Sequence, residues 1–581
     1  MRRLLPPLAT TLVCVGAAVI LSWPLATDPA GSVRETVLSP DASVGRWLPG
    51  HLAARIRAGQ NPFQAPDLYW PDGFDLCGGL HNLGVDLLLV PLYLVFAPVL
   101  AYNVGSLLIA LANAAAGWRL GRTLGQGRPE AAAASALVLG CSAFAWYEAM
   151  AGRHAQAFLA PMTLTLLGLW EITRGRSSGR TAVATGVALA VTGYCYWFYA
   201  AFIGLVAVPL ALVATLPPRR QRWLTLAGTL VVALVLATPG VVPLLAAAAS
   251  PDSIVRRGIE AGAGPFRADF SLHLTGLFWP AAWWDGPSAR LPFVVEALVL
   301  SGLVLGALRR RAGFLPWLAG IAVILALGEH AGWYAHSPVE IRGHRVPLPL
   351  ALGVRLPLLE RFWWPSRLLA LTWVGAAGVA AVAVSHPSRP RKRWLLAASI
   401  VSLVVLEGTL LLRQRDVPSQ DRLLSRVEVP AFFEELGREP GRWPLLQLPF
   451  WTVNNCATFW VTWHRQPLDG GPGCQRTAFV PAATLRRVEA DPVLSALRRL
   501  HEPDGEPPPG LDVAAGLRRL GYRYVLLWRE PVIDGPLLTR RVVSLLGEPM
   551  HIEEAPFEVW DLETSLTASN PDARGRSAAG R

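Results

Sequence analysis

The stretch SPDASVGRWLPGHLAARIRAG, residues 39–59, is followed directly by QNPFQAPDLYWPDGFDLCGGLHN, residues 60–82. Together they make up most of a polar interval, Thr27 to Asn82, that separates two strongly apolar runs. The first piece has the pattern of an amphipathic helix that starts near Asp41, and the second is dense in Pro, Gly, aromatic and acidic residues. A simple connector needs neither this length nor this mixture. The interval therefore predicts an outer loop that builds a functional site.

The rest of the composition is that of an integral membrane protein. The 581 residues are 52% hydrophobic and only 16% charged, whereas soluble domains are about a quarter charged. A membrane span needs roughly 20 apolar residues, and the first 412 positions contain many such runs. After Arg413 the composition becomes mixed. The sequence predicts a polytopic α-helical membrane domain at 1–412 with its outer loop at 27–82, a C-terminal α/β soluble domain at 413–563, and a disordered tail at 564–581.

The formal net charge of +12 does not indicate nucleic-acid binding, because many of the Lys and Arg residues lie in short clusters between apolar runs. Such clusters mark cytoplasmic loops. If all of them face the cytoplasm, eleven crossings result, with the N-terminus inside and the soluble domain outside. The expected spans lie near 8–26, 103–121, 130–146, 156–173, 181–197, 198–216, 223–245, 291–308, 313–329, 366–384 and 394–412.

One further apolar run, residues 83–100, does not fit this count. It contains Asp86 and two prolines, Pro91 and Pro98. We expect it to be embedded in the membrane without crossing, although a twelfth span is the alternative.

Within the soluble part, periodicity predicts two helices and three strands, namely helices at 429–438 and 511–520 and strands at 444–450, 524–528 and 557–561. Cys456 and Cys474 are the two cysteines of this part, and an external location would allow a disulfide between them. No CxxC or HExxH pattern is present, so no zinc site is expected.

Asp41 has two interpretations. As a structural residue it would be the N-cap of the helix that presents Val44, Leu48 and Leu52 on one face. As a functional residue it would be a base at the membrane surface, soon after the first span. One residue can fulfil both roles.

Two other outer intervals carry unusual polar residues. Tyr147–Ala155 and the start of the next span hold Glu148, Arg153, His154 and Gln156. These are either functional groups at the bilayer or the polar residues of a simple turn. In the interval before the tenth span, Arg361 and Arg367 flank an aromatic pair, and guanidinium groups there suit an anionic headgroup or anionic lipid in general. Glu407, inside the last span, needs a polar partner or a proton.

The order of motifs resembles the GT-C superfamily of integral-membrane glycosyltransferases, and more closely a bacterial subfamily with a C-terminal periplasmic domain. The features that carry the resemblance are D-x5-W from Asp41, NPF, YWPDG, the pair His81–Asn82, LAYN, GRHAQ, LLERFWWPSR, LRRLGYRYVLLWRE and EEAPFEVWDL.

The resemblance implies an inverting transfer of a sugar from a polyprenyl-phosphate donor to an acceptor hydroxyl at the outer face of a bacterial cytoplasmic membrane. It implies Asp41 as the catalytic base and the outer arginines as ligands of the lipid phosphate. His81 and Asn82 would join Glu148, Arg153, His154, Gln156, Arg361 and Arg367 in binding substrate. No DxD pattern occurs in the second outer loop, so a divalent metal is not indicated. Two alternatives stay open, a transporter or flippase of a lipid-linked glycan and a non-catalytic scaffold.

Overall fold

The computed structural model of the chain folds into two compact units. Unit 1 comprises Met1–Thr36, His81–Leu244 and Ala261–Arg426, and unit 2 comprises Val37–Leu80, Leu245–Glu260 and Val427–Arg581. The structure describes residues 5–23, 25–33, 40–79, 82–216, 219–260, 271–272, 274, 277, 291–334, 337–353, 364–413, 425–450, 455–471, 480–500, 502, 504–529, 535–550, 552 and 557–563. The predicted tail at 564–581 and Cys474 lie outside these residues.

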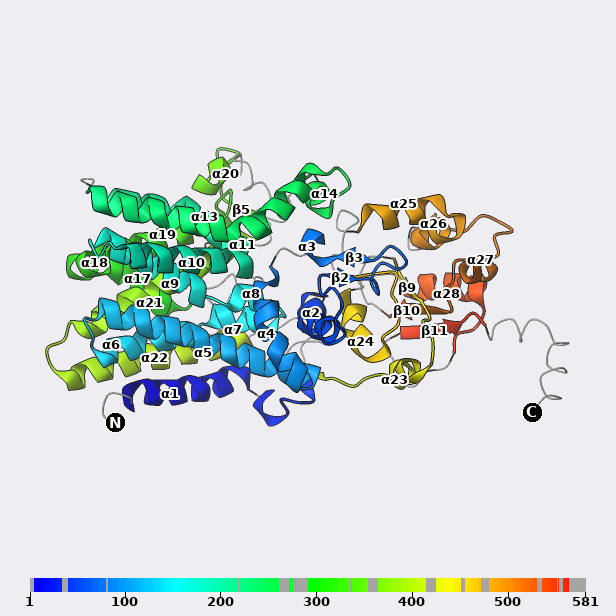
Figure 1. Ribbon diagram of the computed structural model, residues 1–581, viewed down its shortest axis with the longest axis horizontal. Coiled ribbons are helices and arrows are strands. Elements are labelled where there is room, and N and C mark those ends of the chain that lie inside the picture. The colour runs from blue at the N-terminus through cyan, green and yellow to red at the C-terminus, as the bar shows by residue number, and fades with distance from the viewer. Residues whose placement is uncertain are drawn as a thin grey trace. The chain divides into compact units, whose positions relative to one another are not determined.

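Unit 1 is built from apolar helices, and the long ones run roughly parallel to one another (Figure 1). The helices are α1 (Leu5–Ser22), α4 (Leu83–Val95), α5 (Pro98–Leu124), α6 (Pro129–Gly140), α7 (Ala143–Met150), α8 (His154–Ala157), α9 (Ala160–Thr173), α10 (Gly179–Cys195), α11 (Trp197–Phe202), α12 (Val208–Ala214), α13 (Arg220–Ala249), α17 (Phe293–Val304), α18 (Gly306–Ala312), α19 (Leu315–Ala326), α20 (Pro349–Gly353), α21 (Leu369–Ser385) and α22 (Pro390–Arg413). A π-helical turn, Ile203–Ala207, joins α11 to α12, and a 3-10 turn, Pro365–Leu368, precedes α21.

Helices occupy each of the eleven segments that the sequence predicts as spans. Seven of the described helices or helix pairs are long and apolar enough to cross a membrane, namely Pro98–Leu124, Pro129–Met150, His154–Thr173, Trp197–Ala214, Arg220–Ala249, Pro365–Ser385 and Pro390–Leu412. Shorter apolar helices lie at Pro7–Ser22, Leu83–Val95, Phe293–Val304 and Leu315–Ala326. The membrane character of the chain follows, while the number of crossings stays a prediction.

The run at 83–100 contains the 13-residue helix α4, which is separated by two residues from the start of α5 at Pro98. At 1.5 Å per residue this helix is about 20 Å long, shorter than a hydrocarbon core of about 30 Å. Its length fits a segment that is embedded without crossing.

The tightest packing in unit 1 joins α5 to α6 through small residues. Gly117 and Gly121 lie one turn apart on α5, facing α6. A Cβ atom at Gly117 would lie 2.6 Å from the backbone oxygen of Ser135, and one at Gly121 would lie 2.5 Å from that of Ala131. Small side chains at such positions let two membrane helices approach closely.

Replacing Gly121 by alanine should therefore destabilise the protein by about 1–3 kcal/mol, because the methyl group would overlap backbone atoms that cannot move aside. Thermal melting of the protein in detergent measures this effect. Gly16 on α1 is the control, since a Cβ there meets nothing within 4 Å. Equal melting temperatures for Gly121→Ala and Gly16→Ala would show that α5 and α6 are not in close contact.

Several basic clusters meet at the ends of the unit 1 helices. Arg393 pairs with Glu130 at 3.2 Å, which links the first turn of α22 to the first turn of α6. Arg174 donates to the backbone oxygen of Arg311 at 2.9 Å, which joins the clusters after α9 and in α18. A Cβ at Gly175 would lie 3.2 Å from the guanidinium of Arg222. These contacts favour the prediction that the clusters face the same side of the membrane.

The carboxylate of Glu407 has the polar partner that its place in a span requires. Its Oε2 accepts a hydrogen bond from the backbone N–H of Val294 at 3.0 Å. Val294 lies in the first turn of α17, where backbone N–H groups have no partner within the helix. Glu407 therefore supplies a cap for a neighbouring helix, which is a structural role.

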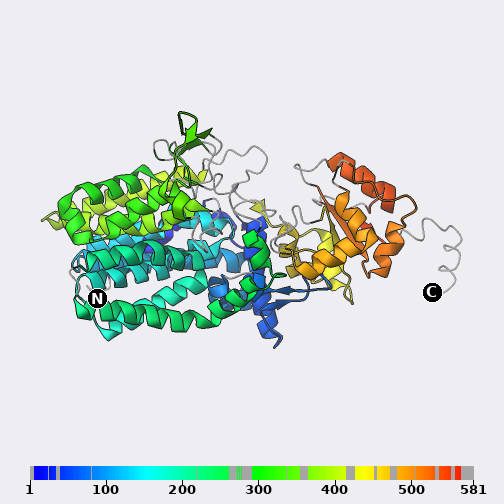
Figure 2. The same cartoon turned by 90° about the horizontal axis from the view of Figure 1, so that it is seen from above.

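The strands of unit 1 are short. β1 (Ser32–Val33) pairs with β8 (Ser425–Arg426). β4 (Gly332–Tyr334) pairs with β5 (Ser337–Pro338), and β6 (Glu340–Ile341) pairs with β7 (His344–Arg345). Figure 2 shows the strands β4 to β7, in green, standing clear of the unit 1 helices.

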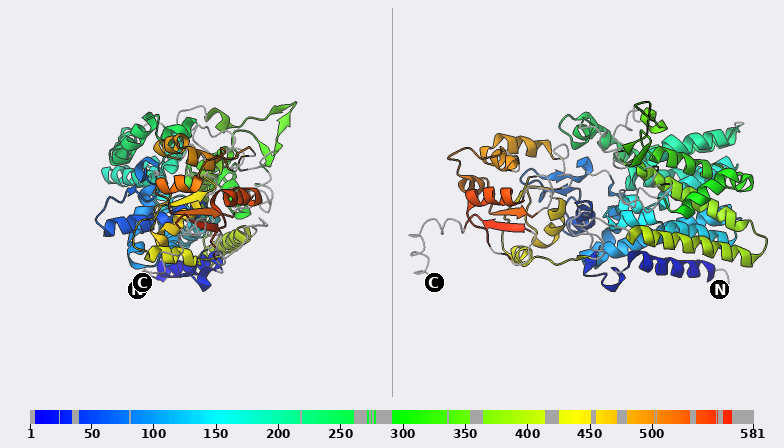
Figure 3. Two further views of the ribbon diagram at one scale, coloured as in Figure 1. Left: turned by 90° about the vertical axis from the view of Figure 1, so that its right-hand side faces the viewer. Right: turned by 180° about the vertical axis from the view of Figure 1, so that it is seen from behind.

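Unit 2 combines helices with a three-stranded sheet. β9 (Leu445–Leu448) runs parallel to β10 (Tyr524–Trp528), which pairs antiparallel with β11 (Phe557–Asp561), and Figure 3 shows β10 and β11 side by side. The strands lie where the sequence predicts them, and α23 and α27 match the two predicted helices. The helices of this unit are α2 (Pro40–Arg57), α3 (Leu76–Gly79), α14 (Ile254–Glu260), α23 (Ala431–Arg438), α24 (Asn455–His464), α25 (Ala482–Ala490), α26 (Pro492–Arg499), α27 (Val513–Arg519) and α28 (Gly535–Leu546).

Residues 37–80 of the first outer loop belong to unit 2, together with the C-terminal residues 427–581. Residues 67–70 of the loop pair with residues 468–470. Leu468 N donates to Asp67 O at 2.7 Å, and Trp70 N donates to Leu468 O at 2.8 Å. Leu468 in turn forms a parallel bridge to Leu445 of β9. Residues 67–70 thus extend the pairing of the C-terminal sheet. The loop also contributes the short hairpin of β2 (Gln64–Ala65) and β3 (Phe74–Asp75).

The helix that carries Asp41 packs within the same unit. Ser43 Oγ accepts a hydrogen bond from Phe459 N at the middle of α24, at 3.1 Å, and the guanidinium of Arg46 lies 5.9 Å from the Phe459 ring centre. The interpretation of Asp41 as the N-cap of this helix is not confirmed. The helix begins at Pro40, so Asp41 lies inside the first turn. Proline is favoured at the first helical position because its missing N–H would have no partner there.

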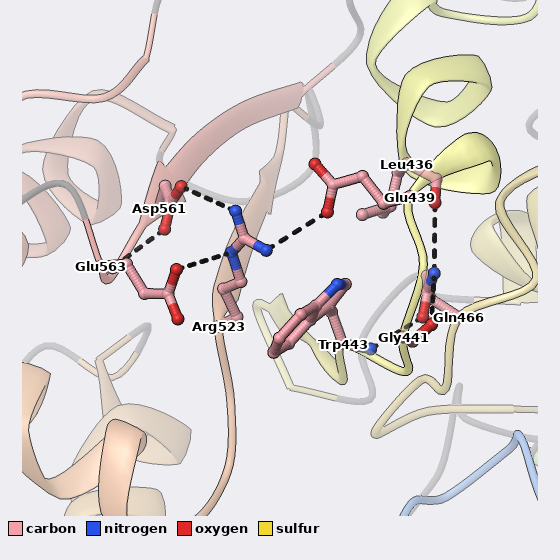
Figure 4. Close-up of polar contacts among 8 residues, drawn as sticks. All are labelled: Leu436, Glu439, Gly441, Trp443, Gln466, Arg523, Asp561 and Glu563. Atoms are coloured by element: carbon pink, nitrogen blue, oxygen red, sulfur yellow. Dashed lines mark hydrogen bonds and ion pairs between the residues drawn. The ribbon is translucent and has the colours of Figure 1, made fainter. Parts of the chain in front are cut away.

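Arg523, just before β10, joins several pieces of unit 2 (Figure 4). Its guanidinium contacts the carboxylates of Glu439 at 3.2 Å, Glu563 at 3.4 Å and Asp561 at 3.6 Å, and it lies over the Trp443 ring. Three acidic partners neutralise this arginine and leave it no capacity for a ligand, so we assign it a structural role.

Candidate functional site

The helical structure is interrupted at the GRHAQ motif, between the end of α7 and the start of α8. This interruption connects two candidate spans, Pro129–Met150 and His154–Thr173, and is the centre of the site in unit 1. Helix ends leave backbone groups without partners, and here side chains of other helices supply them. Asn113 Nδ2 donates to Ala157 O at 2.8 Å while its Oδ1 accepts from Ala160 N at 2.9 Å. Tyr102 donates to Ala149 O at 2.5 Å. The interruption is therefore built into the bundle and is not a surface turn.

This interruption holds a buried ion pair. Arg153 Nε donates to Glu148 Oε2, and the Glu148 side chain is only 2% exposed. The Arg153 guanidinium also lies 5.3 Å from the ring centre of Tyr147. An ion pair in this environment needs close contact and further hydrogen bonds to persist. Glu148 is thus committed to neutralising Arg153.

His154 and Gln156 are buried beside the pair. His154 Nε2 lies 2.8 Å from Ser106 Oγ, and the His154 ring stacks on Tyr102 with centres 4.5 Å apart. The backbone oxygen of Gln156 accepts a hydrogen bond from Tyr199 at 2.7 Å. These contacts come from α5 and α11 and fix the motif from two sides.

Arg367 enters from the 3-10 turn before α21. Its guanidinium stacks on Trp364, with Cζ 4.0 Å from the ring centre, and Nη1 donates to the hydroxyl of Tyr196. The residue is only 8% exposed. Among the residues that the structure describes, Arg367 has no acidic partner within ion-pair distance. A buried cation in this state is suited to an anionic ligand.

Tyr196 connects Arg367 with the ion pair of Glu148 and Arg153. Besides its hydrogen bond with Arg367, it lies within electrostatic range of Glu148 and Arg153. A guanidinium can only donate, so the Tyr196 oxygen is the acceptor and its own O–H proton is available for another group. With one carboxylate against two guanidinium groups, the cluster carries an excess of one positive charge.

The structure brings together five of the substrate-binding residues that the sequence predicts, namely Glu148, Arg153, His154, Gln156 and Arg367. Asn82 joins them indirectly, because its Oδ1 accepts from Trp197 N, next to Tyr196, at 3.3 Å. Asp41 lies in the first turn of α2 in unit 2, and its side chain is not among those described. His81 and Arg361 lie outside the described residues. No described group of His, Cys, Asp and Glu could hold a metal ion, and metal independence stays a prediction.

Trp364 belongs to the aromatic pair that the sequence analysis singled out, whereas no role was predicted for Tyr102, Asn113, Tyr196 and Tyr199. Three of these four are aromatic residues in or beside apolar runs, where an aromatic side chain is usually part of the core or of an interfacial belt. Asn113 was detectable, since an amide inside a span needs a partner.

Replacing Tyr196 by phenylalanine should weaken the binding of an anionic lipid by about tenfold. The change removes the hydroxyl that orients Arg367, and hydrogen bonds to charged groups contribute about 1.5–3 kcal/mol. Tyr199→Phe is the matched control, because its hydroxyl bonds only a backbone oxygen among the partners given above. Titration of both variants with undecaprenyl phosphate measures the effect, and equal dissociation constants for the two would contradict this role for Tyr196.

The fold of the described residues is similar to the folds of two solved proteins, AftD and ArnT. The arabinofuranosyltransferase AftD from Mycobacteria matches with a TM-score of 0.55 and 16% sequence identity, over 95% of this chain and 40% of AftD. ArnT from Cupriavidus metallidurans, in its apo state, matches with a TM-score of 0.50 and 15% identity, over 96% of this chain and 98% of ArnT. ArnT has also been solved bound to undecaprenyl phosphate.

The chain thus spans about two fifths of the length of AftD and nearly all of ArnT. No protein-family model matches the sequence, and no curated protein matches it. At these identities the likeness concerns the fold.

Proposed function

We propose that the chain transfers a sugar from a polyprenyl-phosphate donor to an acceptor hydroxyl at the outer face of a bacterial cytoplasmic membrane. The observation that carries the proposal is the buried guanidinium of Arg367, which has no acidic partner among the described residues. Trp364 stacks on this guanidinium, and the hydroxyl of Tyr196 accepts a hydrogen bond from it. Burying a guanidinium costs free energy unless an anion pairs with it.

A lipid phosphate is the anion that fits this setting best. The planar guanidinium fork matches phosphate oxygens, and stacking on Trp364 fixes its orientation in advance. The excess positive charge of the cluster would balance a phosphate group. The likeness in fold to ArnT, which binds undecaprenyl phosphate, supports the same choice.

In the proposed reaction Asp41 is the base. Its carboxylate accepts the proton of the acceptor hydroxyl, and the oxygen attacks the anomeric carbon of the donor sugar. The bond from that carbon to the phosphate oxygen breaks, the electron pair leaves with the phosphate, and the configuration inverts. Arg367 stabilises the charge that develops on the leaving phosphate. Arg153 contributes less, because Glu148 already neutralises it.

Transport of a lipid-linked glycan is the second candidate, and the polar residues buried among the unit 1 helices, such as Glu148, His154 and Gln156, favour it. Polar and ionisable groups inside a membrane bundle can mark the path of a transported substrate. The likeness to sugar-transferring enzymes favours transfer. Release of free undecaprenyl phosphate by the purified protein would distinguish the two functions, since a transporter leaves its cargo intact.

The Arg367→Lys variant tests the anion site. Lysine keeps the charge but loses the planar fork, so the dissociation constant for undecaprenyl phosphate should rise about tenfold, equivalent to about 1.4 kcal/mol. Undecaprenol, which lacks the phosphate, should bind the wild type and the variant equally. Unchanged affinity for the phosphate in Arg367→Lys would mean that this arginine does not recognise the donor.

A further inference from the structure

Arg487 on α25 holds the first outer loop to the C-terminal part of unit 2. Its Nη2 donates to Trp70 O at 2.7 Å and its Nε donates to Asp72 Oδ2 at 3.1 Å. Its Nη1 donates to the Tyr522 hydroxyl at 3.4 Å. One guanidinium thus binds two residues of the loop and one residue beside β10. Each of the three nitrogens of the guanidinium donates one of these hydrogen bonds.

The same loop residues have further partners in the C-terminal part. Thr484, one turn before Arg487, donates to Asp72 Oδ2 at 2.9 Å. The Trp70 ring packs edge-on against Tyr522, with centres 5.3 Å apart. The Arg487 and Asp72 side chains are each 21% exposed. A partly buried, multiply bonded pair constrains its partners more than an exposed pair does.

The contacts continue from this point to α2, the helix that carries Asp41. The β2–β3 hairpin links residues 64–65 to residues 74–75 on either side of Trp70 and Asp72. His51 Nε2 lies 3.2 Å from Gln64 O, and Arg55 donates to Asn61 O at 3.3 Å. The loop is therefore a connected piece in which α2 is bonded to the hairpin and the hairpin to Arg487.

We propose that Arg487 is a positioning residue for the transfer reaction. By holding Trp70 and Asp72 it fixes the loop that carries Asp41, so the C-terminal part of unit 2 belongs to the catalytic apparatus. This inference rests on the proposed function in one respect, the role of Asp41 as the base. It argues against a C-terminal domain that serves only to recruit partners.

The test uses the full-length protein in detergent and compares two adjacent arginines. Arg487→Met removes the contacts with the loop. Arg486→Met is the matched control, because among the described residues Arg486 forms an ion pair with Asp252, at 2.9 Å, and both side chains are more than half exposed. Arg487→Met should lower kcat about 10- to 100-fold with the donor KM nearly unchanged, since misplacing a reacting group costs rate more than binding. Arg486→Met should behave like the wild type.

Hydrogen exchange of the α2 amides provides a readout that does not depend on activity. Exchange in α2 should be about tenfold faster in Arg487→Met than in Arg486→Met, while the amides of β10 exchange as in the wild type. Faster exchange of the β10 amides as well would mean that Arg487→Met unfolds the domain. The test would then use Arg487→Lys in place of Arg487→Met. Lysine keeps the charge opposite Asp72 but loses the fork, so kcat should fall between those of the wild type and the Met variant.

Unchanged exchange of α2 in Arg487→Met would overturn the inference, whether or not transfer is detected. Faster exchange with an unchanged kcat would overturn it as well. Absence of transfer by the wild type would refute the proposed function instead, and the exchange of α2 would then still decide whether Arg487 holds the loop.

Discussion

Replacing Asp41 by asparagine is expected to lower the rate of sugar transfer by about 10²–10⁴-fold, because an amide cannot accept the proton of the acceptor hydroxyl. Folding should change little. Asp41 lies in the first turn of α2, where a carboxylate gains about 0.3–1 kcal/mol from the helix dipole. Single-turnover rates and thermal melting, measured on the same preparation, separate the two effects.

Asp41→Ala is the companion variant, which should lose both the activity and some stability. Transfer by Asp41→Asn at nearly the wild-type rate would mean that the base lies elsewhere. Glu148 would be the next residue to replace, although its ion pair with Arg153 makes it a poor base.

A second large effect is expected from Asp469→Asn in unit 2, on stability. Asp469 is 3% exposed and burial raises its pKa to about 7, an effect only partly offset by the N–H of Gln447 and the charge of Arg487. Between about pH 4 and pH 7 the folded state therefore binds more protons than the unfolded state. Stability must fall as the pH rises through this range, by about 4 kcal/mol. Asparagine carries no charge and keeps an acceptor for the Gln447 N–H.

The variant should thus match the wild type near pH 4 and become progressively more stable than it up to about pH 7. The quantity to measure is the difference in the free energy of unfolding between variant and wild type at each pH. The absolute values are less informative, because buried His464 changes the stability of both proteins with pH in the opposite direction. Burial lowers its pKa to about 3, so its contribution to stability is lost as the pH falls below about 6.5. A difference between Asp469→Asn and wild type that does not change with pH would show that Asp469 ionises normally.

The membrane helices could be predicted from the sequence because burial in a bilayer needs only an apolar run of sufficient length. The strands at 445–448, 524–528 and 557–561 were equally visible, since each is a short apolar run bounded by turn residues. Both signals are local in the chain.

The two features that were not predictable depend on contacts between distant residues. Residues 67–70 join the C-terminal sheet through residues 468–470, about four hundred positions later, and no local pattern marks that pairing. The interruption at GRHAQ depends on Tyr102, Asn113 and Tyr199, each from another helix. The motif was recognised by its polar residues, but its depth in the bundle could not be read from them.

The central claim, that the chain consumes a lipid-linked sugar, is tested most directly by mass spectrometry of membrane lipids from a strain that lacks the gene. The account predicts accumulation of a polyprenyl-phosphate sugar that disappears when the wild-type gene is restored and persists when the Asp41→Asn gene is supplied. Lipid profiles that are identical in all three strains would contradict it.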